Sequence, residues 1–489
     1  MKDPSRFAIA FLLLIATLGL IASGEGQPAS TQLSPDSRRP NIIWLIAEDV
    51  GTDFGCYGDP SSRTPNLDKF ASQGCMYRQA HSTGPVCSTS RSALITGMYQ
   101  TSFGAQNHRS HRDDGYMLPP GIRLITDRLR DVGYFTANVV TLPAPIMWKG
   151  AGKTDYNFNT PKSPFDSAKW EDLKAHQPFY AQVNFHETHR NYEKAEENPT
   201  DPATVKVPPY LPDNEIARAD WAVYHDAINE LDAKVGQVLD LIDKEGLGDN
   251  TLIFFFGDHG RECFRGKYYA FEQGTIAALL ARWPGHLSPG TSSDDLVSFI
   301  DITATSLSAA GIALPPELPG IPFIGPDARR RQYLFTARDR IDETLDHVRT
   351  VRDDRYKLTR NYEPERPYLQ PMIYAEHTNP NVNMMKKLYA EGKLNADQAQ
   401  FMAPHRPFEE LYDLKTDPWE FHNLATLPEY RETLTRMETV LDQWRIDTND
   451  KGLSPEDPVV LGKYLDRYMR QEEKLFANGN NDPLKKPAP

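Results

Sequence analysis

Two polar pairs in this 489-residue chain each follow directly after a run of apolar residues. The stretch "NIIWLIAED" ends in Glu48 and Asp49, and "TLIFFFGDHG" carries Asp258 and His259 after its apolar run. Carboxylate oxygens suit calcium or magnesium and an imidazole nitrogen is a borderline ligand, so the four side chains could together hold one divalent cation. Any one of them taken alone is more typical of a solvated loop.

Further candidate groups follow other predicted strands or loops. "VNFHETHR" places His186 and His189 three residues apart after an apolar stretch, where they could be metal ligands, general acids or polar loop residues. Lys153 and Lys267 lie in "GKTDYNF" and "RECFRGKYY". A lysine at such a position is usually solvated, so neither one by itself predicts catalysis.

The segment "TGPVCSTSRSALITG" places Cys87 at the start of a predicted helix. A cysteine followed by small hydroxylated residues and by Arg91 is unusual for a helix that only packs. Arg91 lies about one helical turn after Cys87 and can reach back to it; the alternative is a surface arginine. The chain has four cysteines, too few for a disulfide-built fold. Cys56 and Cys75 could pair, or be two small buried residues.

The elements that must position these residues alternate between helix and strand. Continuous apolar runs such as the one before Glu48 are typical of strands buried on both faces of a parallel sheet. Between the two runs, apolar residues recur at helical spacing over residues 228–242. This alternation predicts an α/β fold with a mostly parallel central sheet sandwiched by helices. Ligands bind beyond the carboxyl ends of such strands, where both polar pairs lie.

The composition and the N-terminal segment limit the kinds of partner that we expect for this protein. The formal net charge of −13 argues against a surface built for nucleic acid. Lys2 and Arg6 precede an apolar run and then small residues, the layout of a signal peptide over residues 1–26. The alternative, an uncleaved membrane anchor, is disfavoured because the run is short. We therefore expect a periplasmic or secreted protein with no membrane contact after cleavage.

Around Cys87 the chain resembles the type I sulfatases of the alkaline phosphatase superfamily. The Cys-x-x-x-Arg element and the "SALITG" that follows are similar to that family's signature. An acidic pair precedes it, and Gly-Lys, His-x-x-His, Asp-His and a further lysine follow in the family's order. "FEELYDLKTDPWEFHNLA" resembles the C-terminal region of the sulfamidase-like branch, which acts on N-sulfoglucosamine. The resemblance implies the family's fold, with a smaller C-terminal α+β domain that carries an antiparallel sheet.

The resemblance also implies the centre of the site. A formylglycine-generating enzyme would oxidise Cys87 to formylglycine, an aldehyde whose hydrate attacks sulfur while Arg91 orients it. Glu48 and His259 depart from the aspartate and asparagine that are commoner in the family. The metal would be calcium, with magnesium or manganese as alternatives, and its ligands would be Glu48, Asp49, Asp258 and His259.

The remaining matched residues would handle the substrate. Lys153 and Lys267 would bind sulfate oxygens, His189 would protonate the departing oxygen or nitrogen, and His186 would contact the substrate. Relatives often place a histidine two residues after the Gly-Lys lysine, where this chain has Asp155.

Two further features of the sequence bear on maturation and on the second half of the reaction. Thr89 stands where the family's signature usually has proline or alanine, which bears on recognition by the oxidising enzyme. Because the histidine expected after Gly-Lys is missing, the base for sulfate elimination is sought elsewhere. The sequence leaves this base unassigned, with His108 as the first candidate and His111 as the second.

The substrate pocket is expected to draw on a second domain. The charged, alternating segment around "VRTVRDDRYKLTR" marks the change of pattern. Its candidate sugar-binding residues are Arg338, Arg340, Asp342 and Glu343, with a salt-bridged surface as the alternative. The predicted divisions are a signal peptide at 1–26, a linker at 27–39, a catalytic domain at 40–329, a C-terminal subdomain at 330–474 and a disordered tail at 475–489.

Three functions are compatible with these residues. The first is a calcium-dependent formylglycine sulfatase that removes sulfate from a sulfated carbohydrate, as an O-sulfate ester or a sulfamate. The second keeps the fold and metal but hydrolyses phosphodiesters or phosphonate monoesters. The third is a non-catalytic protein that binds sulfated glycans, with Cys87 unmodified.

Overall fold

The computed structural model describes residues 39–112 and 114–477. The predicted signal peptide, residues 27–38 of the predicted linker and residues 478–489 of the predicted tail lie outside the described residues. Within the described part of the chain, no helix combines the length and the apolar character needed to cross a bilayer.

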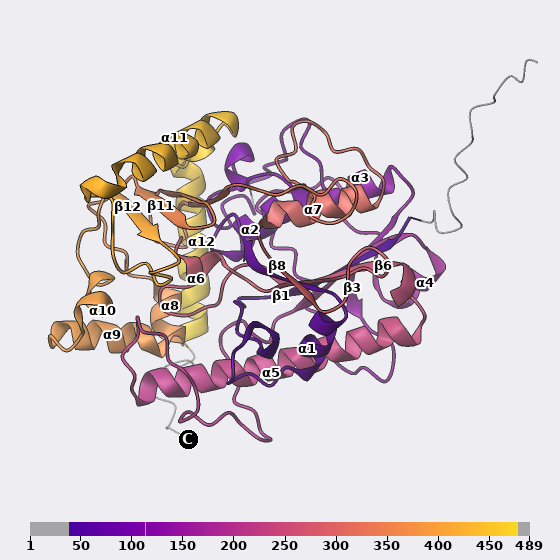
Figure 1. Ribbon diagram of the computed structural model, residues 1–489, viewed down its shortest axis with the longest axis horizontal. Helices are drawn as coiled ribbons and strands as arrows, with labels where there is room; N and C mark the ends of the chain where they lie inside the picture. The colour runs from indigo at the N-terminus through magenta and orange to yellow at the C-terminus, as the bar shows by residue number, and fades with distance from the viewer. Residues whose placement is uncertain (1–38, 113, 478–489) are drawn as a thin grey trace, which may run out of the picture. The chain divides into compact units, whose positions relative to one another are not determined.

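An eight-stranded sheet forms the larger layer of strands, in the order β4-β3-β5-β1-β6-β7-β2-β8 (Figure 1). Neighbouring strands run parallel except at β7, which is antiparallel to both β6 and β2. The strands are β1 (Asn41–Ala47), β2 (Cys75–His81), β3 (Phe135–Thr141), β4 (Ser167–Lys169), β5 (Phe179–Phe185), β6 (Thr251–Gly257), β7 (Leu279–Arg282) and β8 (Thr291–Ser298).

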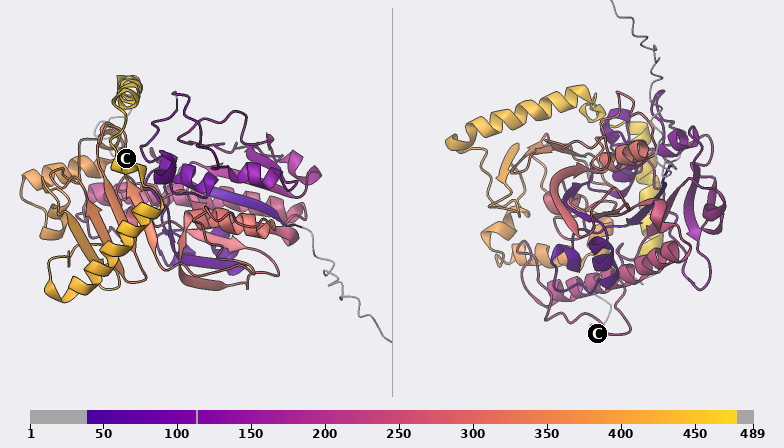
Figure 2. Two further views of the ribbon diagram at one scale, coloured as in Figure 1. Left: turned by 90° about the horizontal axis from the view of Figure 1, so that it is seen from above. Right: turned by 45° about the vertical axis from the view of Figure 1, so that its right-hand side comes forward.

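Helices cover both faces of this sheet, and β1 shows why. Alternate side chains of a strand point to opposite faces, and in β1 all seven residues are buried. Trp44 lies in an apolar cluster with α2, α3 and α7, whereas Leu45 lies in a second cluster with α1, α4 and α5. Figure 2 shows the strands between these helices. The helices are α1 (Pro65–Ser72), α2 (Cys87–Thr96), α3 (Ile125–Arg130), α4 (Glu171–Ala175), α5 (Glu215–Lys244) and α7 (Phe299–Ala309).

The predicted elements that carry the polar pairs are confirmed. β1 and β6 coincide with the two apolar runs, and the helical spacing over 228–242 falls within α5. α5 begins after Asn214, whose side chain accepts a hydrogen bond from Ala217 N at 3.0 Å and so caps the helix. α2 begins at Cys87, as its sequence predicted.

A smaller antiparallel sheet follows, in the order β12-β11-β10-β9, and confirms the predicted antiparallel subdomain. Leu434, Met437 and Leu441 of α11 pack on this sheet in one apolar cluster. The predicted boundary at 329/330 stays a prediction. The elements are β9 (Leu334–Arg338), β10 (Val348–Arg352), β11 (Tyr356–Asn361), β12 (Glu409–Asp413), α6 (Glu272–Thr275), α8 (Ile373–Thr378), α9 (Pro380–Ala390), α10 (Ala396–Gln400), α11 (Arg431–Asp447) and α12 (Pro458–Ala477).

Candidate active site

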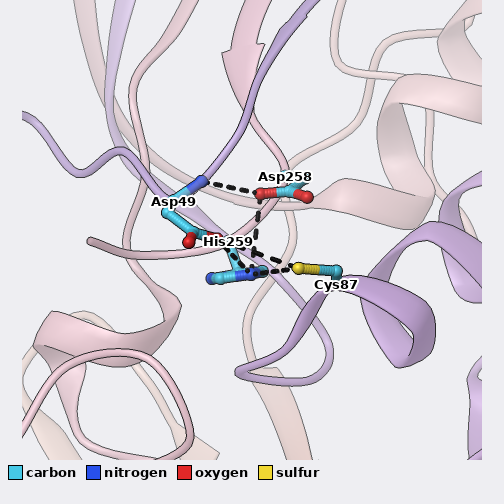
Figure 3. Close-up of side chains that lie close together, drawn as sticks. All are labelled: Asp49, Cys87, Asp258 and His259. Carbon is cyan, nitrogen blue, oxygen red and sulfur yellow. Dashed lines mark hydrogen bonds and ion pairs between the residues drawn. The ribbon is translucent and has the colours of Figure 1, made fainter. Parts of the chain in front are cut away.

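Four buried side chains meet at the carboxyl end of the large sheet (Figure 3). The ligand atoms of Asp49, Cys87, Asp258 and His259 all lie within 4.8 Å of one another. His259 Nε2 is 3.1 Å from Asp49 Oδ1, 3.6 Å from Asp258 Oδ1 and 3.3 Å from Cys87 Sγ. The group combines carboxylate oxygens, an imidazole nitrogen and a sulfur, a set that could bind a divalent cation.

The pairing of β1 with β6 brings the two polar pairs together. Ala47 lies opposite Gly257, so the residues that follow leave the sheet side by side. Asp258 N donates to Ala47 O at 2.9 Å, and Asp49 N donates to Asp258 Oδ1 at 3.0 Å. A Cβ on Gly257 would lie 2.5 Å from Val50 O, so a larger residue would separate the two chain ends. Asp49 has φ 51°, a strained conformation of the kind found at functional sites.

The first turn of α2 holds Cys87 against this group. Ser90 Oγ donates to the backbone oxygen of Asp258, which ties α2 to the end of β6. Burial by itself raises the pKa of the Cys87 thiol, but Lys153 and Lys267 outweigh burial and bring that pKa below its ordinary value. The helix N-terminus adds partial positive charge. Negative charge on the side chain at position 87 is therefore stabilised.

Two cationic side chains compensate the buried carboxylates. Arg91 Nε lies 2.9 Å from Asp258 Oδ2, and Arg91 Nη1 donates to Asn184 Oδ1 at 2.7 Å. Arg91 Nη2 is buried and has no hydrogen-bond partner among the described residues. Lys267 Nζ lies 2.7 Å from Asp49 Oδ2. The unpartnered nitrogen of Arg91 leaves one buried donor available to a ligand.

Glu48 lies at the edge of the four-residue group. Its carboxylate forms an ion pair with Lys153 Nζ, and it is not among the residues whose ligand atoms cluster within 4.8 Å. Its role as a metal ligand stays a prediction. The side chain of Lys153 is 18% exposed, so this ion pair borders the accessible side of the site.

The electrostatics of the group favour a cation at its centre. Burial by itself lowers the pKa of His259, but Asp258, Cys87 and Asp49 outweigh burial and raise that pKa well above its ordinary value. Burial alone would raise the pKa of Asp258, yet His259 and Arg91 lower it to about 2. The anionic groups thus draw a positive charge to the position between them, which a bound metal would supply.

The two histidines that follow β5 take different positions. His189 Nε2 lies 3.9 Å from Asp49 Oδ2, and its Nδ1 lies 2.7 Å from Arg190 O, so Nε2 faces the four-residue group. Burial and the charge of Lys267 lower the pKa of His189. The side chain of His186 is 62% exposed, and its Nδ1 lies 3.9 Å from a carboxylate oxygen of Glu187. The structure therefore brings His189, but not His186, to the four-residue group.

His108 belongs to a chain of polar contacts that reaches α12. Its Nδ1 lies 2.8 Å from Ser88 Oγ, in the residue next to Cys87, and its Nε2 lies 3.8 Å from Asp342 Oδ1. Tyr464 OH donates to the same Asp342 oxygen at 2.7 Å. Burial, followed by the charge of nearby arginines, holds the pKa of His108 well below its ordinary value. The ring is therefore neutral at pH 7, and burial and the arginines oppose its protonation.

The other predicted sugar-binding residues face protein partners. Arg338 Nη1 lies 3.0 Å from Asp346 Oδ2, and Arg340 Nη2 donates to Glu456 Oε1 at 2.9 Å. Both arginines are buried. Glu343 accepts a hydrogen bond from the backbone of α8. Their role in sugar binding stays a prediction.

Several polar residues at the site were not singled out from the sequence. Glu262 is buried, and burial raises its pKa to about 7 against the opposing charge of Lys267. Asn184, which binds Arg91, is a polar residue within the fully buried strand β5, and that pattern could have indicated it. Ser88 had no comparable signal. Asp155 was noted in the sequence only as the residue in place of a histidine, and its ion pairs with Arg109 and Arg112 were not predicted.

The remaining question from the sequence concerns the cysteines. All four cysteines lie in the described part of the chain and are free thiols, so Cys56 and Cys75 are not paired.

Known proteins with similar sequences are sulfatases. The sulfatase family matches residues 40–312, and the C-terminal domain of N-sulphoglucosamine sulphohydrolase matches residues 257–403. An ulvan-active sulfatase of Formosa agariphila is 33% identical over 94% of this chain and 81% of its own length. Human N-sulphoglucosamine sulphohydrolase is 25% identical over 87% of this chain and 94% of its own length.

A similar solved structure supports the same fold. The structure of a 2-O GAG sulfatase superposes with a TM-score of 0.63 at 19% identity, covering 86% of this chain and 96% of that one.

Proposed function

This chain belongs to the sulfatase family of enzymes, and we propose that it removes sulfate from a sulfated carbohydrate by means of a formylglycine at position 87 and a bound calcium ion. The observation that carries the proposal is the position of Cys87. Its Sγ lies 3.3 Å from His259 Nε2 and 3.8 Å from Asp49 Oδ1, within the group that could hold a metal.

The donor set supports a divalent cation. Asp49 and Asp258 offer carboxylate oxygens and His259 offers an imidazole nitrogen, and all three side chains are buried. The raised pKa of His259 fits a position that attracts positive charge. Carboxylate oxygens favour calcium, and magnesium or manganese would fit the same donors. When bound, the cation would polarise a sulfate oxygen and offset negative charge on the nucleophile.

The surroundings of position 87 suit the nucleophile that conversion of Cys87 to formylglycine would provide. The conversion would supply a hydrated aldehyde as the nucleophile. The lowered pKa of the thiol indicates a field that would equally favour an anionic oxygen on the same carbon. Arg91 Nη2, buried and without a partner among the described residues, is available to donate to such an oxygen.

The remaining residues would bind the sulfate and move protons. Lys153 and Lys267 would bind sulfate oxygens as point charges. Both form ion pairs with carboxylates of the site, and both lower the pKa of Cys87. His189, with Nε2 facing the site, would protonate the leaving oxygen or nitrogen. His108, held by Ser88, would accept the proton during sulfate release.

The relatives support a sulfated carbohydrate as the substrate class. One is named as ulvan-active, another as an N-sulphoglucosamine sulphohydrolase, and the fold neighbour as a GAG sulfatase. Both O-sulfate esters and sulfamates are therefore candidate substrates. The predicted signal peptide would direct the enzyme to the periplasm or the medium, where such polymers occur.

The deciding experiment is peptide mass spectrometry across residues 79–91 of protein purified from its native host, followed by assays on sulfated sugars. We expect formylglycine at position 87 and release of inorganic sulfate. Cys87→Ala should abolish turnover, whereas Cys56→Ala is the matched control and should retain it, because Cys56 lies outside the four-residue group. An intact thiol at position 87 in an active enzyme, or faster hydrolysis of phosphonate or phosphate esters, would contradict the proposal.

A further inference from the structure

A second charged cluster lies beside the proposed nucleophile. Asp155 forms ion pairs with both Arg109 and Arg112, and its side chain is only 1% exposed. Arg109 Nη2 lies 3.0 Å from Asp155 Oδ2, and Arg112 reaches the other carboxylate oxygen. The two arginine side chains are 32% and 38% exposed. A buried carboxylate thus holds two arginine side chains that are themselves partly exposed.

The cluster is fixed relative to Cys87 through the segment that carries Arg109. Arg109 N donates to Ser88 Oγ at 3.1 Å, and Ser88 follows Cys87 directly in α2. Asn157 accepts from His111 N at 2.9 Å, so the next residues are held as well. These hydrogen bonds leave the guanidinium of Arg109 little freedom to move relative to the nucleophile.

Backbone conformation sets the direction of both partners. Arg109 has φ 56° and Asp155 has φ 49°, values in the left-handed region that residues with a Cβ rarely adopt. Strained residues of this kind persist where the surrounding structure holds them, and they gather at binding sites. Here the strain aims the carboxylate of Asp155 and the guanidinium of Arg109 at each other.

Positive charge accumulates around this cluster. Within the described residues, Asp155 is the one carboxylate within ion-pair distance of Arg109 and Arg112. Arg467 Nη2 donates to Arg109 O at 3.2 Å and brings a third guanidinium close. Burial, followed by the charges of Arg109 and Arg467, lowers the pKa of Arg112 to about 10. A bound anion would relieve the repulsion between Arg109 and Arg112.

The cluster also lies within electrostatic range of the nucleophile. Burial by itself lowers the pKa of Arg109, but a negative charge on Cys87 opposes burial and helps to raise that pKa above its ordinary value. For Arg112, whose pKa is lowered, Cys87 acts in the same opposing direction with a smaller effect. Paired guanidinium forks match the planar oxygens of a carboxylate or of a sulfate. Asp155 therefore has a structural use at a position where the resembling family often has a histidine.

We propose that Arg109 and Arg112, positioned by Asp155, bind a second anionic group of the substrate beside the sulfate that is removed. The inference rests on the proposed function and narrows its substrate class to glycans with two negative groups close together. The second group is a carboxylate, as in a uronic acid, or another sulfate. Arg109 and Arg112 are then specificity residues, and Asp155 is a positioning residue.

The test compares three substrates with matured full-length protein. They are a sugar with a single sulfate, glucosamine with 2-N and 6-O sulfates, and a monosulfated disaccharide that contains a uronic acid. We expect kcat/KM to be highest on one of the two doubly charged substrates, and which one it is distinguishes sulfate from carboxylate as the second group. Carboxyl reduction of the disaccharide should remove its advantage if the carboxylate is bound.

Substitution of Arg112 links the preference to the cluster. Arg112→Ala should lower kcat/KM on the preferred doubly charged substrate roughly 10-fold to 100-fold more than on the singly charged one, mainly through KM. Arg112→Lys should recover part of the loss. Arg123→Ala is the matched control, because Arg123 is a surface arginine paired with Asp131 and should give equal effects on all substrates. Arg112 is partly exposed, so its variants should fold, which circular dichroism will check.

The outcomes separate this inference from the proposed function. Equal kcat/KM on singly and doubly charged substrates, or equal losses in Arg112→Ala on both, would overturn the inference while sulfatase activity stands. Release of sulfate from none of the three substrates by protein that carries formylglycine would overturn both. A preference for two charges that Arg112→Ala removes would support both.

Discussion

Loss of the ion pair between Arg91 and Asp258 should destabilise the metal-free enzyme strongly. The test is a double-mutant cycle with Arg91→Met, Asp258→Asn and the double variant. Methionine keeps most of the apolar stem of arginine, and asparagine keeps the shape of aspartate. The cycle therefore isolates the interaction between the two charges from the loss of packing.

The geometry sets the expected size of the effect. Arg91 Nε and Asp258 Oδ2 are 2.9 Å apart, and the side chains are 3% and 0% exposed, so solvent screening is small. At that separation and an effective dielectric constant of about 20, the Coulomb energy is roughly 5 to 6 kcal/mol. Removal of one partner from a buried pair costs about 3 to 5 kcal/mol. Because His259 also compensates Asp258, we expect a coupling energy of roughly 2 to 3 kcal/mol.

The assay is urea unfolding followed by tryptophan fluorescence, with and without calcium. Without metal, each single variant should be less stable than the wild type, and the double variant should be more stable than the sum of the two losses predicts. With calcium, the coupling should shrink, because the proposed cation would neutralise Asp258 in place of Arg91. If the losses add within about 0.5 kcal/mol without metal, the two charges do not stabilise one another and the reasoning fails.

Three further predictions concern other parts of the site and fold. Lys267→Ala should reduce kcat/KM for a sulfate ester by roughly 100-fold or more, because the ammonium group of Lys267 pairs with Asp49 and influences Cys87. Lys169→Ala, on the exposed strand β4, is the control and should leave kcat/KM unchanged; steady-state release of sulfate measures both variants. Burial raises the pKa of Asp339 from 3.8 to about 6 against the charge of Arg349, so the unfolded chain ionises first as the pH rises. The free energy of unfolding should therefore fall by about 2 kcal/mol between pH 4 and 6; Asp339→Asn should remove that slope in urea titrations, and an unchanged slope would refute the assignment. Tyr464→Phe removes the hydroxyl that donates to Asp342 at 2.7 Å, and Asp342 lies beside His108. The variant should have a kcat several-fold lower, a shifted pH profile of kcat and a nearly unchanged KM; an unchanged pH profile would mean that this contact does not position His108.

Local patterns in the sequence were enough to predict the elements that frame the site. The apolar runs before Glu48 and Asp258 became the adjacent central strands β1 and β6, because only strands buried on both faces of a sheet keep such continuous apolarity. The segment after Val86 begins a helix at Cys87, as its composition predicted. Since parallel strands end at the same edge, even the meeting of Asp49 with Asp258 followed from the pattern.

Contacts between distant residues were decided only by the tertiary structure. Glu48 forms an ion pair with Lys153 and is not among the four residues whose ligand atoms cluster, a contact that no local pattern predicted. Ser88 bonds to His108, and Asp155 bridges two arginines, with no local pattern to indicate either contact. Hydrophobic periodicity reports which face of an element is buried, and therefore sets strands and helices. The pairing of polar side chains depends on long-range packing and on the cost of leaving a buried charge unpaired. No single segment of the sequence carries that information.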